Sequence, residues 1–509
     1  MPITRCGNAT SGFSDITHLL KLSHIDWVLL ITLSYLIWAI AVCIGLILAR
    51  RSPVATVGWM VSLLFLPYVG ALVYLFFGPR RLRRKRLRYS QARKLIGQAA
   101  ARLEKAGIPD NINEDIRLRY RQLAGLATRL RQTPPLRAEA VTIYISGDEC
   151  YSAIEKAITA AANHIHVESY IWDPGGAADL LRDALTERAR AGVAVKVIVD
   201  DVGSGKADEK YFATLLAAGG EVAWFNPIRI SRFRPTLLNF RTHRKIVVID
   251  GRVAFTGGMN ISDNHSSGFS RAKAWRDTHM RIDGAPAAAL QRLFLEDWQF
   301  ANGHCKVLPA HFAGMAEADA KPTGNNVSGP SVQIIASGPD DPSYAIQSFL
   351  FAAIATARHS LAITTPYFVP NEPMLEALKS AALRGLEVRL LVPKEGDSKI
   401  VSAAARSYFD ELVAAGVAIF EYGPPMLHAK TMVIDNTVAI VGTANLDNRS
   451  FRLNFEVMAV VYDLLVAEEL VGIFEADLSN AKRYRQRAGR ESFKVRFLFG
   501  LARLFSPIL

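Results

Sequence analysis

The feature that most constrains the fold is an internal repeat about 180 residues long. In residues 164–225 the hydrophobic pattern predicts strand, helix, strand, helix and strand, and residues 359–422 repeat that order. Alternating strands and helices indicate an α/β sheet, and the period is far longer than that of a solenoid unit. We therefore expect two fused α/β halves related by a pseudo-twofold axis.

Each half continues into the same polar motif, THRKIVVID (242–250) in the first and LHAKTMVID (427–435) in the second. A His and a Lys two residues apart fall on one face of an expected strand, and an Asp follows five residues after the Lys. Glycine-rich segments follow, TGGMN (256–260) and VGTAN (441–445), each ending on an Asn 17 residues after the His. One such match is weak evidence, but two copies with equal offsets inside matching repeats predict a shared site.

These residue types suit phosphoryl transfer. A lysine is a compact cation for a phosphate oxygen, and asparagine side chains with glycine-turn amides add neutral donors. A histidine can attack phosphorus as a neutral imidazole or donate a proton as an imidazolium, so two histidines facing one phosphate fill both roles. Neither half supplies the pair, and the site is expected between the halves. The candidates are His243, Lys245, Asn260, His428, Lys430 and Asn445.

Four carboxylates are candidates for supporting the histidines. Asp277 and Glu456 follow the two Asn residues in equivalent strand contexts, and we expect them to orient the rings; a strand-edge charge is the alternative. Asp250 and Asp435 are included in the catalytic set as electrostatic support, although pairing at their own turns is the preferred interpretation. No carboxylate cluster for Mg²⁺ accompanies the motifs, and two lysines offset the phosphate charge, so no metal or other cofactor is expected. The four cysteines lack metal-ligand spacing and are expected to be reduced.

Two apolar segments precede the repeat, one at 25–49, whose single charged residue is Asp26, and an uncharged one at 54–77. Each is long enough to span a bilayer as a helix, and together they predict a transmembrane hairpin; a buried soluble hairpin is the alternative. Pro67 and Gly70 leave open a shallow re-entrant second segment. Seven basic residues follow at 79–88, and the positive-inside bias then predicts a cytoplasmic C-terminal part.

The charge distribution separates the ends of the chain from its centre. The net charge is +13, with +15 in residues 1–137 and +7 in residues 482–503, which leaves −9 between them. A nucleic-acid enzyme would place its positive field over the catalytic region, so no nucleic-acid partner is expected. Basic flanks beside apolar segments indicate anionic lipid instead. The tail 491–509 has apolar residues at helical spacing and is expected to lie at the membrane interface, or else to pack on the core. The Arg-rich segment 226–241 is expected to line the entrance of the site; an ordinary basic loop is the alternative.

The expected organisation therefore has seven parts. They are an N-terminal tail (1–24), the transmembrane hairpin (25–77), a basic juxtamembrane connector (78–137), the first α/β half (138–312), a linker (313–331), the second α/β half (332–481) and a basic amphipathic tail (482–509).

The two HxKxxxxD motifs with their Gly/Asn segments resemble the phospholipase D superfamily over residues 140–480. Within it, TPYFVP, LHAKTMVID and GTANLDNRSFRLNFEV resemble the bacterial cardiolipin synthases, as do THRKIVVIDG, AFTGGMNISD, the paired apolar segments with their basic stretch, and the ending LARLFSPIL. This resemblance implies two phospholipase D-like α/β/α halves with one site at the pseudo-twofold axis. It implies an integral enzyme of the bacterial inner membrane that converts two phosphatidylglycerols into cardiolipin and glycerol through a phosphatidyl-histidine. The family roles carry over to His243, Lys245, Asn260, His428, Lys430, Asn445 and, as a ring-orienting acid, Glu456.

The first half departs from the symmetric pattern. Position 271, eleven residues after Asn260, is Arg, whereas Glu456 lies eleven residues after Asn445. Asp277 must therefore fill the acid's role across a longer loop.

Other functions stay open at this point. A different enzyme of the superfamily would use phosphatidylethanolamine, an alcohol or water as the acceptor. A membrane-tethered nuclease and a non-enzymatic membrane scaffold are the remaining alternatives.

Overall fold

The computed structural model describes residues 13–48, 53–66, 69–70, 82–101, 114–227, 239–270, 273–315, 329–486 and 493–506. The chain divides into two compact units. One comprises Met1–Leu82 with Arg234–Thr236, and the other comprises Arg83–Phe233 with Leu237–Leu509.

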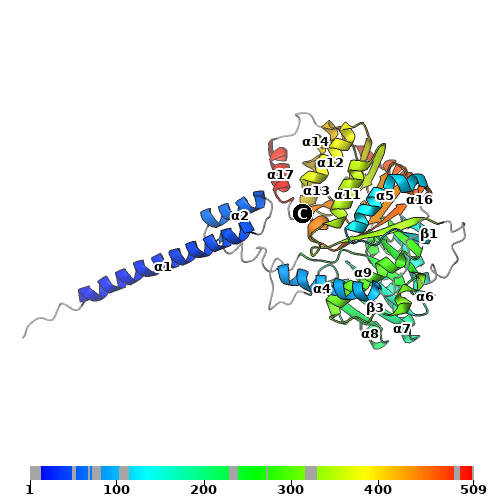
Figure 1. The fold of residues 1–509 in the computed structure, drawn as a ribbon, viewed down its shortest axis with the longest axis horizontal. Helices are drawn as coiled ribbons and strands as arrows, with labels where there is room; N and C mark the ends of the chain where they lie inside the picture. The colour runs from blue at the N-terminus through cyan, green and yellow to red at the C-terminus, as the bar shows by residue number, and fades with distance from the viewer. Residues whose placement is uncertain are drawn as a thin grey trace, which may run out of the picture. The chain divides into compact units, whose positions relative to one another are not determined.

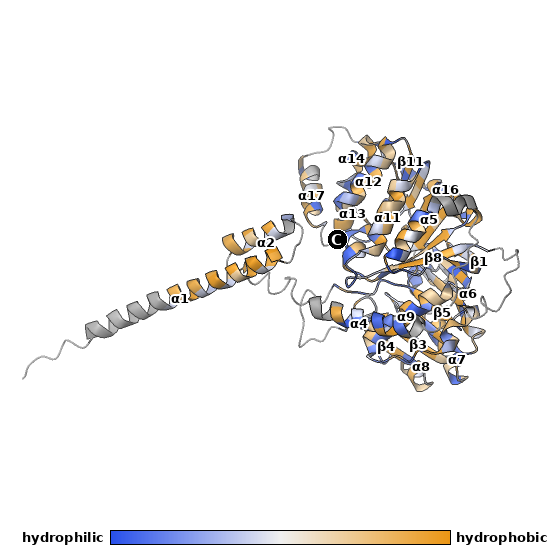
Figure 2. Ribbon diagram, in the orientation of Figure 1, coloured by the Kyte–Doolittle hydropathy of each residue, from blue (hydrophilic) through white to orange (hydrophobic). Residues whose placement is uncertain are grey.

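The N-terminal unit contains two apolar helices, α1 (Phe13–Leu48) and α2 (Pro53–Phe65). Within the described residues, Trp27–Leu48 is the one stretch long and apolar enough to cross a membrane. Figure 2 shows this part of α1 and much of α2 as hydrophobic, and most of their large apolar side chains are exposed. The first predicted span is thus present as a long apolar helix. Of the second predicted span, 54–77, the structure describes residues 54–66 and 69–70, and the remainder lies outside the described residues.

The two helices pack on each other over a short contact. Val42, Leu46 and Leu63 are buried between them, and the Tyr35 hydroxyl donates a hydrogen bond of 2.6 Å to the Leu63 carbonyl. Their remaining apolar surface is what lipid tails would cover.

The second unit is built on one sheet, in which 15 strands are described. The first half supplies β1 (Leu136–Tyr144), β2 (His164–Ser169), β3 (Ala194–Asp200), β4 (Glu221–Phe225), β5 (Ile246–Ile249), β6 (Val253–Gly257) and β7 (His279–Gly284). The second half supplies β8 (Ser331–Ser337), β9 (Ser360–Thr364), β11 (Glu387–Pro393), β12 (Ala418–Tyr422), β13 (Thr431–Ile434), β14 (Val438–Gly442), β16 (Glu456–Tyr462) and the edge strand β17 (Ala481–Arg483). A separate parallel pair consists of β10 (Phe368–Val369) and β15 (Leu446–Asp447).

The strand order reveals the repeat. The first half runs β1-β7-β6-β5-β2-β3-β4 and the second runs β8-β16-β14-β13-β9-β11-β12. The halves join through antiparallel pairing of β1 with β8, where Leu136 faces Val332. The predicted fold of two fused α/β halves with pseudo-twofold symmetry is confirmed.

Helices cover both faces of the sheet (Figure 1). In the first half α6 (Gly147–Thr159), α7 (Gly176–Arg190) and α8 (Ala213–Ala217) cover one face and α9 (Ala287–Asn302) covers the other. In the second half α11 (Ala345–Thr356), α12 (Glu372–Leu383), α13 (Lys399–Arg406) and α14 (Phe409–Ala414) cover one face and α16 (Leu464–Leu478) the other. Strand residues alternate between the two cores, as Met432 and Ile434 against Val433 illustrate. Short helices follow β6 (η4, Asp263–His265), α9 (η5, Pro309–Phe312) and β15 (α15, Asn448–Arg452).

The segment expected to be a connector contributes buried side chains to this unit. In α4 (Leu82–Ala101) the side chains of Tyr89, Ala92 and Ile96 are buried, and α5 (Glu114–Arg129) joins the second-half core through Tyr120 and Leu123. The described helices of this segment therefore pack into the second unit.

Tyr89 of α4 is hydrogen-bonded to a buried ion pair next to the first motif. Its hydroxyl donates to Asp297 Oδ1 at 2.6 Å and accepts from Arg244 Nη1 at 2.9 Å. Arg244 and Asp297 form an ion pair of 2.5 Å, and both are fully buried. Arg244 lies between His243 and Lys245 in the sequence, so α4 is attached directly to the catalytic motif.

The tail helix α17 (Phe493–Leu504) combines the two expectations for the C-terminus. Ala502 is buried in the second-half core, and Ser506 Oγ lies 2.9 Å from the Tyr408 hydroxyl. Phe493, Phe497 and Leu504 are exposed, at 82%, 60% and 75%. One side of the tail therefore packs on the enzyme while a second, apolar side faces outward.

Candidate active site

The two motif histidines lie just before strands, not within them. The sequence predicted His243 and Lys245 on a strand, yet β5 begins at Ile246; His428 and Lys430 likewise precede β13. The chain leaves the sheet at these points because it bonds to the opposite half. The His243 amide donates to the Phe455 carbonyl at 2.9 Å, and the His428 amide donates to the Arg276 carbonyl at 2.7 Å. Each motif is therefore held by the other half.

The acids that orient the histidines are exchanged between the halves. His243 Nδ1 lies 3.0 Å from Glu456 Oε2, and His428 Nδ1 lies 2.7 Å from Asp277 Oδ2. Because a carboxylate accepts from Nδ1–H, the ring proton is held on Nδ1 and Nε2 stays unprotonated. Both acids are fully buried. Asp277 and Glu456, expected from their sequence contexts, thus stand where ring-orienting acids are needed.

The two acids are structural equivalents despite their different sequence offsets. The Gly258 amide donates to the Thr278 carbonyl, and the Thr443 amide donates to the Val457 carbonyl, each one residue after the acid. Glycine at 258 is required by the close approach, since a Cβ there would lie 2.0 Å from Asp277 Oδ1. Thr443 instead uses its hydroxyl, which donates to Glu456 Oε2 at 2.5 Å.

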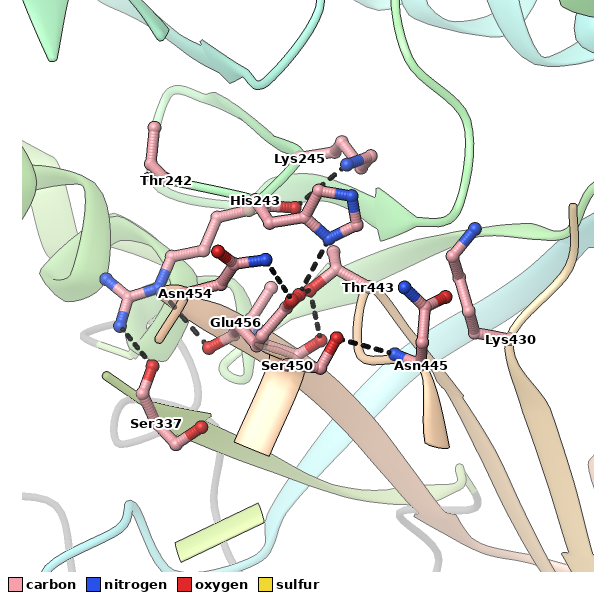
Figure 3. A network of polar contacts seen from close by, with 12 residues as sticks. Thr242, His243, Lys245, Ser337, Lys430, Thr443, Asn445, Ser450, Asn454 and Glu456 are labelled. Atoms are coloured by element: carbon pink, nitrogen blue, oxygen red, sulfur yellow. Dashed lines mark hydrogen bonds and ion pairs between the residues drawn. The ribbon is translucent and has the colours of Figure 1, made fainter. Parts of the chain in front are cut away.

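Figure 3 shows the second-half side of the site, where His243, Thr443 and Asn454 gather around Glu456. The two lysines lie beside their histidines. Lys245 Nζ donates to the His243 carbonyl at 2.9 Å, and Lys430 Nζ lies 2.9 Å and 3.1 Å from the two ring nitrogens of His428. Both ammonium groups are buried and available to a phosphate.

The two asparagines end the glycine turns at matching positions. The Asn260 amide donates to His265 Nε2 at 3.3 Å, and the Asn445 amide donates to Ser450 Oγ at 3.1 Å. Both asparagine side chains are buried, and their Oδ1 atoms have no hydrogen-bond partner among the described residues. An unpaired buried acceptor beside a candidate phosphate site indicates a place for a donor group of the substrate.

Sequence reasoning missed His265 and Trp275. The His265 ring lies 5.5 Å from the Trp275 ring and 5.7 Å from the His428 ring. The sequence does contain a signal for His265: it stands five residues after Asn260, just as Ser450 stands five residues after Asn445.

Asp250 and Asp435 do not join the site, which corrects their inclusion in the catalytic set. Each occupies the turn after its motif strand with positive φ, 52° and 51°. Asp250 accepts hydrogen bonds from the amides of Ala162, Asn163 and His164, and Asp435 accepts from three amides at residues 358–360. These aspartates anchor the start of β2 and β9, which is the structural role preferred from the sequence.

The Arg-rich segment is only partly described. Arg229, Arg232 and Arg234 lie outside the described residues. Arg241 is 1% exposed and bonds Asp200 at 3.3 Å and the Asn226 carbonyl at 3.0 Å, so it supports the loop and does not line an entrance.

Burial and mutual repulsion shift the pKa values of the motif residues. Burial, together with repulsion from Lys430, lowers the pKa of Lys245 to about 7, and burial lowers that of Lys430 to about 8. Burial lowers the pKa of His428 to about 4 and also lowers that of His243. Burial alone would raise the pKa of Asp277, but Lys430 and His428 hold it well below its usual range. The site therefore pairs ionised acids with neutral imidazoles and easily discharged lysines.

One group of side chains has the spacing of metal ligands. Donor atoms of His265, Asp277 and His428 all lie within 4.8 Å of one another. Asp277 Oδ2 already accepts from His428 Nδ1, so a metal ion here would compete with ring orientation. The described cysteines, Cys43, Cys150 and Cys305, are free thiols.

Two matched halves, each bringing one His and one Lys to a site built at their junction, define a phospholipase D-like transferase. A family model for the phospholipase D-like domain of cardiolipin synthase matches residues 154–298 and 350–478, and one for a phospholipase D-nuclease N-terminal region matches residues 36–79. In structure, the chain resembles phosphatidylserine synthase of Haemophilus influenzae, with a TM-score of 0.58 at 17% identity over 76% of this chain and all of that one. That likeness shows the fold alone.

Curated relatives identify the family within this class of transferases. Cardiolipin synthase of Geobacillus kaustophilus is 39% identical over 91% of this chain and 90% of its own. The major cardiolipin synthase ClsA of Bacillus subtilis is 35% identical over 94% of this chain and 99% of its own. The chain belongs to the cardiolipin synthase family and is a membrane-associated phosphatidyltransferase.

The lowered lysine pKa values predict a basic limb in the pH profile. A lysine is charged below its pKa, so the site loses its attraction for a phosphodiester as pH rises through about 7 to 8. We expect kcat/KM to fall between about pH 6.5 and pH 9, with kcat falling at higher pH because bound phosphate favours the charged lysines. Lys245→Arg, which stays charged, should shift the limb upward while lowering the rate. A flat kcat/KM profile across this range, measured on solubilised enzyme, would contradict the assignment.

Proposed function

We propose that the chain transfers a phosphatidyl group from one phosphatidylglycerol to another, giving cardiolipin and glycerol. The observation that carries the proposal is the exchanged pairing of His243 with Glu456 and of His428 with Asp277. In this pairing, one oriented imidazole from each half serves a single site together with Lys245 and Lys430. A phosphodiester is exchanged for a phosphodiester, so no nucleotide energy source is needed.

In the first step Nε2 of one histidine attacks phosphorus and the bond to the glycerol oxygen breaks. The second histidine donates its proton to the leaving alkoxide. Lys245 and Lys430 stabilise the charge on the phosphoryl oxygens. Binding of the anionic phosphodiester raises the histidine pKa values, which provides the proton that the empty site lacks.

In the second step the incoming lipid hydroxyl attacks the phosphatidyl-histidine. The second histidine, now neutral, takes the hydroxyl proton, and the phosphorus–nitrogen bond breaks to release cardiolipin. Since each acid stays ionised beside its ring, the imidazolium that forms in either step is stabilised in place.

The membrane arrangement is part of the proposal. α1 with the segment after it forms a two-span anchor in the bacterial inner membrane, and the seven basic residues at 79–88 keep the catalytic unit on the cytoplasmic side. The exposed apolar side of α17 adds a second, interfacial contact with lipid. Both contacts bring the catalytic unit to its substrate and favour lipid over water as acceptor.

The deciding experiment uses detergent-solubilised full-length enzyme with phosphatidylglycerol labelled in its acyl chains. We expect labelled cardiolipin with release of one glycerol per cardiolipin, without added metal or nucleotide. Phosphatidic acid without cardiolipin would identify a hydrolase instead. Cardiolipin formed only when phosphatidylethanolamine is added would identify a different transferase.

A further inference from the structure

A hollow of about 350 Å³ opens beside the site in the first half. Its wall comes from the loops that follow β2, β3 and β6, namely residues 171–173, 202–203, 205–206, 260, 262 and 264–265, and from Trp275. β2 and β3 are parallel neighbours. Ligands of open α/β sheets bind outside the carboxyl ends of such strands, so this is the position of a ligand site.

The hollow reaches the reacting groups on the His428 side. Asn260 and His265 belong to its wall. The Trp275 ring, also in the wall, lies 5.4 Å from the His428 ring. A small group held in the hollow therefore stands next to the second catalytic histidine.

The wall chemistry favours a neutral ligand with several hydroxyls. Its two charged residues, Lys206 and Asp173, are paired with each other at 3.0 Å. His265 is neutral because burial lowers its pKa to about 3. The other polar wall residues are Asn260, Ser262 and Asn264. Amides, a hydroxyl and a tryptophan suit the hydroxyls and C–H faces of a polyol. An ammonium headgroup would need a carboxylate, and Asp173 is already paired with Lys206.

In the second half, a hydrogen bond between two loops crosses the equivalent place. Thr365 corresponds to Ser169, since each hydroxyl donates to the carbonyl two residues later. Tyr367 therefore stands where Ile171 borders the hollow, and its hydroxyl donates to Asp397 at 2.6 Å between the loops after β9 and β11. The asymmetry suits a reaction whose two lipids play different roles.

We propose that the hollow binds the glycerol headgroup of the acceptor lipid and presents its terminal hydroxyl to the reacting phosphorus. The inference rests on the proposed function. The hydroxyl oxygen bonds to phosphorus, its proton goes to Nε2 of His428, and the bond from phosphorus to Nε2 of His243 breaks, with its electron pair returning to the His243 ring. Asn260 Oδ1, which is buried and has no hydrogen-bond partner among the described residues, accepts from a headgroup hydroxyl.

Gly205 allows the hollow to be filled without straining the backbone. A Cβ at Gly205 would make only ordinary contacts, at 3.7 Å, whereas one at Gly203 would lie 2.2 Å from the Tyr170 carbonyl. Gly205→Leu is therefore the test variant. The matched control is Gly268→Leu, because Gly268 has the same room at 3.7 Å and is not part of the wall. Asn264→Leu, which removes a polar wall group, is the second test variant.

Two measurements on the full-length enzyme separate acceptor binding from the first step. With labelled phosphatidylglycerol, Gly205→Leu should lower the ratio of cardiolipin to phosphatidic acid at least about tenfold, since water then competes better for the phosphatidyl-enzyme. With labelled free glycerol as acceptor, exchange into phosphatidylglycerol should show a KM raised by about tenfold. Asn264→Leu should move both quantities in the same direction, and Gly268→Leu should match the wild type.

Unchanged product ratio and glycerol KM in both test variants would overturn the proposal, as would a wild-type preference for ethanolamine over glycerol. Failure of the proposed function looks different. The wild type would then make no cardiolipin, while glycerol exchange sensitive to position 205 would still locate a polyol site.

Discussion

Replacing either His243 or His428 with alanine is expected to lower cardiolipin formation by about 10⁴-fold or more. Each variant keeps one histidine, both acids and both lysines, so substrate binding should survive. It loses either the nucleophile or the proton carrier, and the complete transfer cannot proceed at a useful rate without both. The measurement is the initial rate of labelled cardiolipin formation by solubilised enzyme.

The control is His304→Ala, because His304 is exposed and belongs to neither motif. Acid quenching should trap labelled phosphatidyl-enzyme in the variant that retains the nucleophile. The order of steps given above assigns this to His428→Ala. A rate within tenfold of wild type in either motif variant would contradict the two-histidine mechanism.

The second large effect is expected from the exchanged acids. Asp277→Asn and Glu456→Gln should each lower the rate by about 10²- to 10⁴-fold, because an amide can fix the wrong tautomer of the ring and no longer stabilises the imidazolium. Both changes are nearly isosteric, so the buried positions should keep their packing. The free energy of unfolding and the rate are measured on the same preparations.

Combining these changes tests which acid serves which histidine. In a His428→Ala background, adding Asp277→Asn should leave the yield of trapped phosphatidyl-enzyme little changed, because its partner ring is already gone. Adding Glu456→Gln should lower that yield strongly, since His243 then loses its orienting acid. The reverse pattern would mean that each acid serves the histidine of its own half.

The sequence predicted the components of the site better than their connections. The repeat, the His–Lys pairs and the Asn turns depend on short offsets, which a linear pattern records. The partners of His243 and His428 depend on how the halves meet, because the amides of both histidines bond to the opposite half. Asp277 and Glu456 could be proposed as acids, but their exchange between halves is a property of the interface.

The same reasoning explains the differences in secondary structure. The sequence predicts a strand over the first motif, residues 242–250, yet only Ile246–Ile249 form β5. The His243 amide bonds to the other half, and Lys245 Nζ donates to the His243 carbonyl. The second helix expected within residues 359–422 is two helices, α13 and α14, separated at Ser407 and Tyr408. Tyr408 is buried there and its hydroxyl lies against Ser506 of the tail, a distant contact that no local pattern contains.

Tyr89 determines where the enzyme can be separated from its anchor. A shortened, soluble chain beginning at the predicted boundary of 138 would discard α4, and with it the hydroxyl shared by Arg244 and Asp297. The buried ion pair under the His243 motif would then face a void, at a cost of about 1–3 kcal/mol for the lost hydrogen bonds and more for the cavity. A truncation intended to keep activity should therefore begin before Leu82, so that α4 remains part of the catalytic unit.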